Sequence, residues 1–230
     1  KNKNVLITGG AGSIGSELAV QLLNVKPRKI HVIDNSEYVL SIIRRNLINK
    51  FKGYNFKLLD IKEFNSFNNY VKQNKIDYIF HSAAFKHVDI LEENIEPAIQ
   101  NNIFGTLNVL KSAANNKSNI TIISTDKAVK PINVLGFTKR ISEILCNLFL
   151  NKGIDIKIVR FGNVIGSRGS AIPLFIKQLN NKEPVTLSSY NARRYFMTIK
   201  EACYLVIECT KIKNKENLFI HNMGKEIKIL

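Results

Sequence analysis

The sequence predicts an α/β protein with a doubly wound parallel sheet, and three observations support this prediction. Short runs of aliphatic and β-branched residues recur along the chain. Segments with helical periodicity separate these runs. The alternation continues as far as Gly162, without an internal repeat or a low-complexity tract. Strands and helices that alternate in this way are typical of a parallel sheet covered by helices on both faces.

The individual elements follow from the same patterns. Strands are expected at residues 5–7, 30–33, 56–59, 78–80, 120–123 and 156–159. Helices are expected where apolar residues recur three or four positions apart, at residues 14–23, 96–110 and 141–148. The second and third strands are followed by Asp34 and Asp60. Because ligands bind at the carboxyl edge of a parallel sheet, these two aspartates are candidate binding residues.

The composition is ordinary for a folded soluble protein, with 45% hydrophobic and 23% charged residues among 230. No apolar run reaches the about 20 residues of a membrane-spanning helix, and the N-terminus lacks the pattern of a signal peptide. The three cysteines, Cys146, Cys203 and Cys209, have no metal-ligand spacing. We therefore expect a cytoplasmic protein without a disulfide framework and without a metal site.

The net charge of +16 raises the question of nucleic-acid binding. The positive residues are mostly lysines spread through the whole chain, and no arginine-rich stripe alternates with aromatic residues. This distribution favours a generally basic surface and no nucleic-acid partner. A basic protein also suits an anionic substrate such as a nucleotide diphosphate.

A glycine-rich segment follows the first expected strand and precedes the first helix. Gly9, Gly12 and Gly15 fit a G-x-x-G-x-x-G spacing. Residues without a Cβ let the backbone approach a pyrophosphate at a helix N-terminus, where free N–H groups attract anions. A tight turn without a ligand is the alternative, but the strand before it and the helix after it favour a Rossmann dinucleotide site. The expected contacts are Gly9, Gly12, Ser13, Ile14 and Gly15.

Further cofactor contacts are expected at the ends of the next three strands. Asp34 would accept hydrogen bonds from both hydroxyls of the adenosine ribose, and its charge, with Glu37 nearby, would repel a 2′-phosphate. We therefore expect NAD rather than NADP. Asp60, followed by Ile61, is placed to contact the adenine, although it could instead be a helix N-cap. The turn Ala83-Ala84 follows the fourth strand and would lie over the cofactor.

The alternation of expected strands and helices changes beyond Gly162. Glycine and serine are dense as far as Ser170, and the elements that follow are shorter. We expect a nucleotide-binding domain over residues 1–164 and a small substrate-binding lobe over residues 165–230. Because the sequence stops within the apolar pair Ile229-Leu230, we expect this lobe to be truncated.

Several motifs resemble the extended short-chain dehydrogenase/reductase family. Besides the glycine spacing, they are His81 to Ala84, Asn101 to Thr106 and Ser124 to Lys127. Longer runs resemble one branch, the polysaccharide-biosynthesis group of UDP-N-acetylglucosamine 4,6-dehydratases. These runs are Phe85 to Val88, Ser124 to Arg140 (STDKAVKPINVLGFTKR), Arg160 to Ser170 (RFGNVIGSRGS) and Arg194 to Ile199 (RYFMTI). The resemblance covers essentially the whole chain.

One position departs from the pattern of the superfamily. Its catalytic pair is a Tyr four residues before a Lys, and here Lys139 is present but the Tyr position is Leu135. Leucine can neither donate nor accept a proton. The larger, membrane-anchored members of the dehydratase branch also lack this Tyr. The resemblance therefore implies an active enzyme, with a non-catalytic NAD-binding relative as an alternative, and it leaves room for a membrane anchor at the cytoplasmic face in a longer protein.

The resemblance implies roles for the residues after the fifth strand. Asp126 would donate a proton to the departing 6-hydroxyl of the sugar, and Lys127 would be the base at carbon 5 or its electrostatic support. Thr125 would bind the hydroxyl on carbon 4. Lys127 can act as a base only if its pKa is lowered, and the alternative is an Asp–Lys pair that caps a loop. Lys139 would bind the nicotinamide ribose.

The remaining assignments concern the substrate and the helix near the site. Lys86 is placed to reach the substrate, and Asn163, Arg168 and Arg194 suit its diphosphate because guanidinium groups offer paired donors and permanent charge. Asn102 would fix helix backbone beside the cofactor. The expected function is NAD-dependent 4,6-dehydration of a UDP-N-acetylhexosamine for surface glycans or glycoproteins, by a homo-oligomer. A UDP-sugar 4-epimerase is the alternative enzyme.

Overall fold

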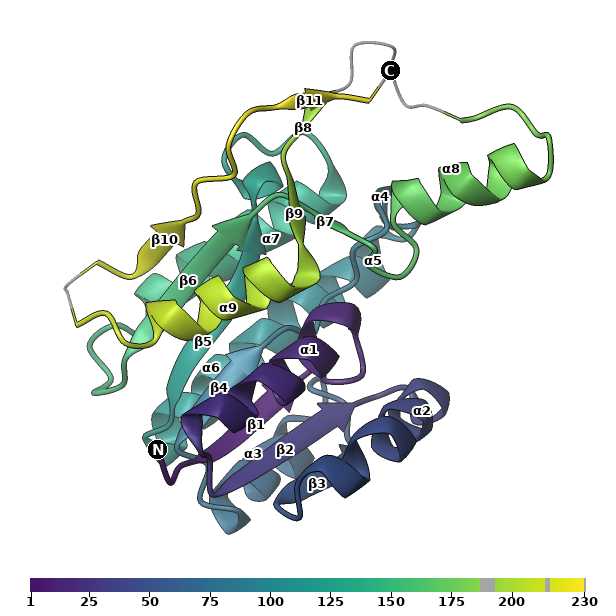
Figure 1. Cartoon of the computed structure of the whole chain (residues 1–230). Coiled ribbons are helices and arrows are strands. Elements are labelled where there is room, and N and C mark those ends of the chain that lie inside the picture. The colour runs from purple at the N-terminus through teal and green to yellow at the C-terminus, as the bar shows by residue number, and fades with distance from the viewer. Residues whose placement is uncertain (187–192, 214–215, 230) are drawn as a thin grey trace.

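The computed structural model describes residues 1–186, 193–213 and 216–229. In these residues a seven-stranded sheet runs in the order β10-β6-β5-β4-β1-β2-β3, and every neighbouring pair is parallel (Figure 1). The strand order reverses between β1 and β4, which marks the point where doubly wound sheets bind ligands. The strands are β1 (Asn4–Thr8), β2 (Lys29–Asp34), β3 (Tyr54–Leu58), β4 (Tyr78–His81), β5 (Asn119–Thr125), β6 (Ile156–Phe161) and β10 (Leu218–Ile220). The prediction of a doubly wound, Rossmann-like α/β fold is confirmed.

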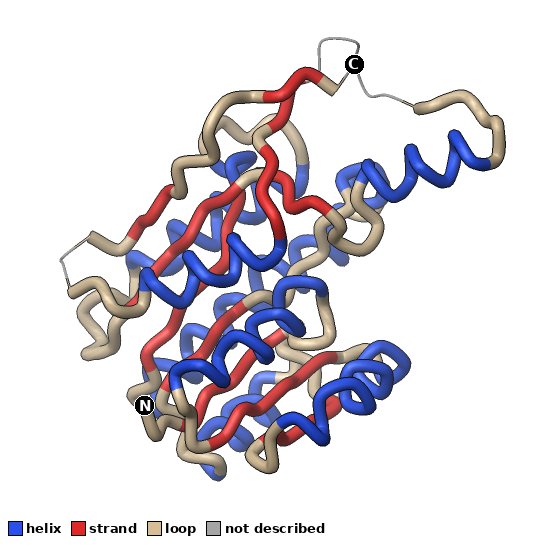
Figure 2. Tube along the Cα trace, viewed as in Figure 1, coloured by secondary structure: helices blue, strands red, loops and turns tan. Residues whose placement is uncertain are grey.

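Helices cover both faces of the sheet (Figures 1 and 2). The helices α1 (Ser13–Gln21), α2 (Glu37–Leu47) and α9 (Ile199–Cys209) pack on one face, and α3 (Phe64–Gln73), α6 (Gly105–Asn116) and α7 (Val134–Asn147) lie on the other. Successive residues of β1 face opposite sides, so Val5 and Ile7 join the first core and Leu6 joins the second. Strands buried on both faces explain the nearly continuous apolar runs in the sequence.

Smaller elements surround the carboxyl edge of the sheet. The helices α4 (Val88–Glu93), α5 (Ile95–Ala98) and α8 (Ala171–Asn180) lie there, and a 3-10 turn spans Asp126–Ala128. Two short ladders pair β7 (Asn163–Ile165) with β9 (Phe196–Thr198), and β8 (Arg193–Arg194) with β11 (Ile227–Lys228). Short 3-10 turns, Leu22–Val25 and Ile48–Lys50, follow α1 and α2. None of the helices in the described ranges is long and apolar enough to cross a membrane.

The helix expected from Glu96 to Leu110 is interrupted in the structure. A π-helical segment, Ile99–Phe104, separates α5 from α6. This wider turn carries Asn101 and Asn102, and both side chains are buried. π-Helical turns are rare and often occur at functional sites, and an apolar periodicity cannot reveal them.

The C-terminal residues contribute to the nucleotide-binding half as well as to the region beyond it. The strand β10 extends the main sheet beside β6, and α9 packs against α1, where Gln21 Nε2 donates a hydrogen bond to the Lys200 carbonyl oxygen at 2.9 Å. Elements on both sides of residue 164 thus share one core. The division into residues 1–164 and 165–230 stays a prediction.

Candidate active site

Two adjoining cavities lie at the carboxyl ends of the strands. The larger has a volume of about 1270 Å³ and the smaller about 150 Å³. Both are lined by Gly9, Gly12, Ser82, Ala84 and Phe85, so the glycine-rich turn forms their common border. An elongated ligand with two bulky ends can therefore occupy both cavities and cross this turn at its middle.

The three glycines of this turn differ in what surrounds them. Gly9 has φ +61°, and a Cβ there would lie 2.6 Å from Ala83 Cα. A Cβ on Gly15 would lie 2.3 Å from the Gly9 carbonyl oxygen, so this glycine lets the helix pack against the turn. A Cβ on Gly12 would meet only the Gly9 carbonyl oxygen, at 3.0 Å. Gly12 therefore leaves its open side for the backbone to approach a phosphate group.

Asp34 lies at the end of β2 and lines the smaller cavity. Its Oδ2 accepts a hydrogen bond from the Ala11 amide at 3.0 Å, and its Oδ1 accepts one from the Ser36 amide at 3.0 Å. The carboxylate thus holds the glycine-rich turn while one side remains next to the cavity. Asp60 and Ile61 line the same cavity. Asp60 accepts from the Lys62 amide at 2.8 Å, and the N-cap of α3 is Glu63, so Asp60 does not cap that helix.

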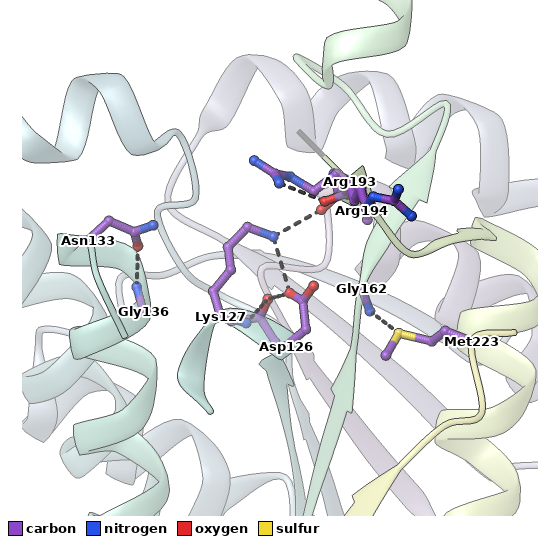
Figure 3. A network of polar contacts seen from close by, with 10 residues as sticks. Asp126, Lys127, Asn133, Gly136, Gly162, Arg193, Arg194 and Met223 are labelled. Atoms are coloured by element: carbon purple, nitrogen blue, oxygen red, sulfur yellow. Dashed lines mark hydrogen bonds and ion pairs between the residues drawn. The ribbon is translucent and has the colours of Figure 1, made fainter. Parts of the chain in front are cut away.

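A polar cluster follows β5 (Figure 3). Thr125 Oγ1 donates to Asp126 Oδ1 at 2.8 Å. The Lys127 ammonium donates to Asp126 Oδ1 at 3.2 Å and to Asn163 Oδ1 at 2.9 Å. The 3-10 turn Asp126–Ala128 places these groups side by side at the end of the strand. A carboxyl group and an amine, each able to carry a proton, therefore stand beside a hydroxyl group in one cluster.

The helix α7 carries Lys139, which lines the larger cavity together with Thr125 and Lys127. Burial lowers the pKa of Lys139 to about 8, although the charge of Glu143 opposes the shift. Leu135 lies one turn before it and lines the same cavity, and Leu135 packs with Leu91 and Ala98. At Gly136 a Cβ would lie 2.6 Å from the Lys127 carbonyl oxygen. The glycine therefore lets α7 approach the polar cluster closely.

A buried ion pair lies beneath these residues. Arg160 of β6 donates to Glu143 of α7 through Nε at 2.7 Å and through its terminal nitrogen at 2.5 Å. Ser124 Oγ donates to the same carboxylate at 2.6 Å. Burial raises the pKa of Glu143, but the hydrogen bonds and charge of Arg160 outweigh this and hold it below its usual range. One carboxylate thus joins β5, which ends at Thr125, and β6 to the helix that carries Lys139.

The residues predicted to bind substrate all line the larger cavity, namely Lys86, Asn163, Arg168 and Arg194. Arg194 Nη1 donates to the Arg193 carbonyl oxygen at 2.7 Å (Figure 3). Lys86 and Arg168 lie near the glycine-rich turn, because the Arg168 amide donates to Ser13 Oγ at 3.0 Å and Lys86 Nζ donates to the Arg168 carbonyl oxygen at 2.8 Å. Of the residues predicted to bind substrate, Arg168 therefore contacts the glycine-rich turn of the predicted cofactor site, and Lys86 is linked to that turn through Arg168.

Most of the other predicted residues also line a cavity. The larger one is lined by Ser13, Ile14, Gly15, Thr125, Lys127 and Lys139, and the smaller one by Ala83. Asp126 and Asn102 are the exceptions among the predicted site residues. Asn102 accepts from the Phe85 amide at 2.8 Å and donates to the Phe85 carbonyl oxygen at 3.0 Å. Its side chain fixes the Phe85 loop, and Asp126 reaches the cavity through its hydrogen bonds with Thr125 and Lys127.

The sequence reasoning missed Glu143, Arg160 and Gly136. A usable signal was present for the first two. Glu143 lies four residues after Lys139 and so on the same side of the helix, and Arg160 is a charged residue near the end of an apolar strand. A strand end that buries arginine needs a carboxylate partner. The need for glycine at 136 depends on how closely α7 approaches the Asp126–Ala128 turn, which only the structure shows.

The whole site can be compared with known proteins. A family model described as polysaccharide biosynthesis protein matches residues 5–230. The chain belongs to this family. The prediction of a polysaccharide-biosynthesis branch of the short-chain dehydrogenase/reductase-like proteins is therefore confirmed, and the curated relatives include a protein named UDP-glucose 4-epimerase.

Three curated relatives illustrate the range of the polysaccharide biosynthesis family. The probable polysaccharide biosynthesis protein EpsC of Bacillus subtilis is 39% identical over 235 residues, which cover 100% of this chain and 39% of EpsC. The capsular polysaccharide biosynthesis protein CapD of Staphylococcus aureus is 40% identical over 236 residues, with the same two coverages. The chain thus spans about two-fifths of the length of these proteins. A UDP-glucose 4-epimerase of Rickettsia bellii is 34% identical over 95% of this chain and 66% of its own length.

Solved structures agree with the fold. Pen from Bacillus thuringiensis has a TM-score of 0.93 and 36% identity, over 99% of this chain and 71% of Pen. The dTDP-glucose 4,6-dehydratase DesIV from Streptomyces venezuelae, solved with NAD bound, has a TM-score of 0.86 and 22% identity, over 98% of this chain and 77% of DesIV. At that identity the second likeness shows the fold alone.

Proposed function

We propose that the protein catalyses NAD-dependent 4,6-dehydration of a UDP-N-acetylhexosamine, with UDP-N-acetylglucosamine as the leading candidate. The observation that carries the proposal is the cluster of Thr125, Asp126 and Lys127 at the end of β5, because Thr125 and Lys127 line the same cavity as Lys139 and the apolar Leu135. Dehydration needs an acid and a base in addition to hydride transfer, and this cluster offers both.

The cofactor proposal rests on the fit of the glycine-rich turn. Gly12 leaves an open approach at the N-terminus of α1, and the two cavities meet at this turn. Asp34 would accept hydrogen bonds from the adenosine ribose in the smaller cavity, with Asp60 and Ile61 beside the adenine. The negative charge of Asp34 favours NAD over NADP. Lys139 would hold the nicotinamide ribose in the larger cavity.

The reaction is redox-neutral, so its steps can be assigned to proton-carrying groups. NAD⁺ supplies reversible hydride transfer, which takes a hydride from sugar carbon 4 and returns it to carbon 6. Thr125 would hold the hydroxyl on carbon 4. As the hydride leaves carbon 4, the proton of the carbon 4 hydroxyl would pass through Thr125 to the Asp126 carboxylate, which Thr125 contacts. Lys127 would take the proton from carbon 5, and Asp126 would pass the proton from the carbon 4 hydroxyl to the hydroxyl that leaves carbon 6 as water. Lys127 would return its proton to carbon 5 when the hydride reaches carbon 6, so both side chains end the cycle as they began it.

The position of Leu135 supports this division of roles. Its side chain is buried with Leu91 and Ala98, and it offers no proton to the cavity. Proton transfer therefore has to come from the cluster after β5. An epimerase needs hydride removal and return at carbon 4 only, and the relative named UDP-glucose 4-epimerase keeps that alternative open for this chain. A non-catalytic NAD-binding protein would not need the Asp126–Lys127 pair.

Incubation with UDP-N-acetylglucosamine followed by mass measurement of the product tests the proposal. Loss of one water supports dehydration. An unchanged mass with a new sugar epimer supports the 4-epimerase, and unchanged substrate with NAD bound supports a non-catalytic relative. Because the chain spans about two-fifths of EpsC and CapD, a product for surface-glycan or glycoprotein synthesis at the cytoplasmic face of a membrane is part of this proposal.

We also propose that the protein forms homo-oligomers. Four large apolar side chains are exposed along α7 at helical spacing, Phe137, Ile141, Ile144 and Leu148. Exposed contiguous apolar surface of this kind marks protein–protein contacts. Sedimentation equilibrium gives the mass of the particle, and a monomer at micromolar concentration would contradict the proposal.

A further inference from the structure

Two cations from segments far apart in the chain lie near the glycine-rich turn, where Arg168 contacts the turn and Lys86 contacts the segment of Arg168. The Arg168 guanidinium donates to the Ala11 carbonyl oxygen, and the Arg168 amide donates to Ser13 Oγ at 3.0 Å. Ala11 and Ser13 are the residues on either side of Gly12. Arg168 therefore lies over the part of the turn where the backbone is open.

Lys86 also contacts the segment that carries Arg168. Its ammonium donates to the Arg168 carbonyl oxygen at 2.8 Å and to Ser167 Oγ at 3.4 Å. The loop of Lys86 also touches this segment at Gly169, where φ is +67° and a Cβ would lie 2.4 Å from His87 Cε1. The loop around Lys86 and the segment around Arg168 thus meet above the turn.

The charges of this pair are not balanced by a nearby carboxylate. In the described ranges no Asp or Glu oxygen lies within ion-pair distance of the nitrogens of Lys86 or Arg168. Burial lowers the pKa of Lys86, and the positive charge of Arg168 lowers it further. Two like charges held together beside a helix N-terminus are stabilised when an anion lies between them. A diphosphate, with two negative groups, matches this arrangement.

We propose that Arg168 and Lys86 form a cationic strap that binds the diphosphate of the dinucleotide cofactor and slows its release. The inference rests on the proposed use of NAD and moves both residues from the substrate, where the sequence placed them, to the cofactor. Contacts with Ala11 and Ser13 favour the cofactor diphosphate over that of a UDP-sugar, because these residues belong to the turn. A redox-neutral cycle returns its hydride within one active site, so retention of the cofactor between turnovers serves it.

Stopped-flow release of NADH, followed by its fluorescence in the absence of any sugar, tests the strap. Arg168→Gln and Lys86→Gln are compared with wild type and with Lys177→Gln, an exposed lysine on α8 that lines neither cavity. Loss of a charge-assisted contact corresponds to roughly ten- to a hundredfold weaker binding. We expect release to accelerate by about that factor in the two strap variants, with Lys177→Gln at the wild-type rate. Arg168→Lys keeps the positive charge but lacks the planar guanidinium group with its paired donors. Its rate of NADH release should therefore lie between those of wild type and Arg168→Gln.

Calorimetric titration with UDP separates the two possible sources of the diphosphate. UDP affinity within about twofold of wild type, together with faster NADH release, supports the strap. Weaker UDP binding with unchanged NADH release overturns it and returns both cations to the substrate. Unchanged binding of both ligands overturns it as well. A variant that purifies without cofactor yet melts cooperatively counts as support, and none of these readouts requires dehydration to occur.

Discussion

The β1–α1–β2 region and the β5–α7–β6 region meet at the same edge of the sheet, but different interactions hold them together. In the first, close backbone approach at Gly9 and Gly15 and an apolar core under α1 shape the turn. In the second, α7 buries Lys139 and Glu143 against the sheet and exposes the apolar Ile141 and Ile144. The first region depends on glycines that have no Cβ atom. The second depends on buried charged side chains that need partners of opposite charge.

Because of this difference, the first region suits recognition of a diphosphate that many ligands share, and the second suits the reaction of one particular substrate. A turn without side chains can bind any diphosphate at a helix N-terminus, so it tolerates a change of substrate in the rest of the cavity. Buried charges cost free energy unless each one has a partner, so the second region accepts few substitutions. The reacting groups are therefore expected to depend on the β5–α7–β6 region and cofactor affinity on the β1–α1–β2 region.

The largest effect should come from the cluster after β5. Asp126→Asn keeps the size of the side chain but removes its titrating group, and Lys127→Ala removes the amine. We expect each to slow water loss by about 10²- to 10⁴-fold, which is the usual contribution of acid–base catalysis. Cofactor affinity should not change, because neither Asp126 nor Lys127 is assigned a contact with the dinucleotide. Product formation by mass spectrometry and NADH titration measure the two quantities.

A nearby lysine provides the control for this pair. Lys130 is exposed and lies three residues after Lys127, so Lys130→Ala should keep the wild-type rate. In Lys127→Ala, exchange of the carbon 5 proton with heavy water should be lost together with dehydration. Wild-type turnover in both Asp126→Asn and Lys127→Ala would eliminate this mechanism, and a different acid–base group would have to be found.

The second effect concerns stability. Glu143→Gln removes the charge that pairs with the buried Arg160, and breaking a buried ion pair from one side typically costs about 3–5 kcal/mol. Chemical denaturation measures the free energy of unfolding. Arg140→Gln is the matched control, because Arg140 contacts the same carboxylate at 3.3 Å from an exposed position, where a pair contributes about 0–1 kcal/mol. Equal losses of unfolding free energy in Glu143→Gln and Arg140→Gln would show that burial does not determine how much each ion pair stabilises the fold.

In the first region single residue types encode the local geometry, so the glycine spacing predicted the turn that the structure shows between β1 and α1. The role of Asp34, which lies at the end of β2, stays a prediction. The second region was harder to predict from its pattern. Apolar residues 141–148 marked the helix α7, but Ile141 and Leu148 are exposed and the polar side of the helix is buried. Periodicity shows that a helix is amphipathic, but which side packs on the sheet depends on partners such as Arg160, which lie elsewhere in the chain.

The third effect concerns the substrate. Arg194 lines the larger cavity beyond the polar cluster, and a guanidinium there can bind a diphosphate through paired donors. Arg194→Ala should weaken UDP binding by roughly ten- to a hundredfold, since a charge-assisted contact contributes about 1.5–3 kcal/mol. NADH release should stay at the wild-type rate. Calorimetry with UDP is the measurement, and unchanged affinity would remove Arg194 from the substrate site.

The fourth effect is a pH dependence that only the β5–α7–β6 region should show. Burial lowers the pKa of Lys139 to about 8, so its ammonium loses its proton as the pH rises through that value. If the charged form holds the nicotinamide ribose, activity should fall about tenfold per pH unit above pH 8. Lys139→Arg stays charged, so this alkaline limb should disappear. An alkaline fall in activity that persists in Lys139→Arg would assign the limb to another group.

The smallest effect belongs to the β1–α1–β2 region and concerns the choice of cofactor. Asp34→Asn keeps an oxygen for the Ala11 or Ser36 amide but removes the negative charge beside the smaller cavity. Repulsion of a 2′-phosphate should weaken, so the preference for NAD over NADP should shrink by about tenfold, or about 1.4 kcal/mol. Paired fluorescence titrations with NADH and NADPH measure it, with Glu93→Gln as the control, because Glu93 is an exposed carboxylate that lines neither cavity. Because charge repulsion acts only on the phosphorylated cofactor, NADPH affinity should account for most of the change. A wild-type protein that already prefers NADPH would show that the charge of Asp34 does not face the ribose.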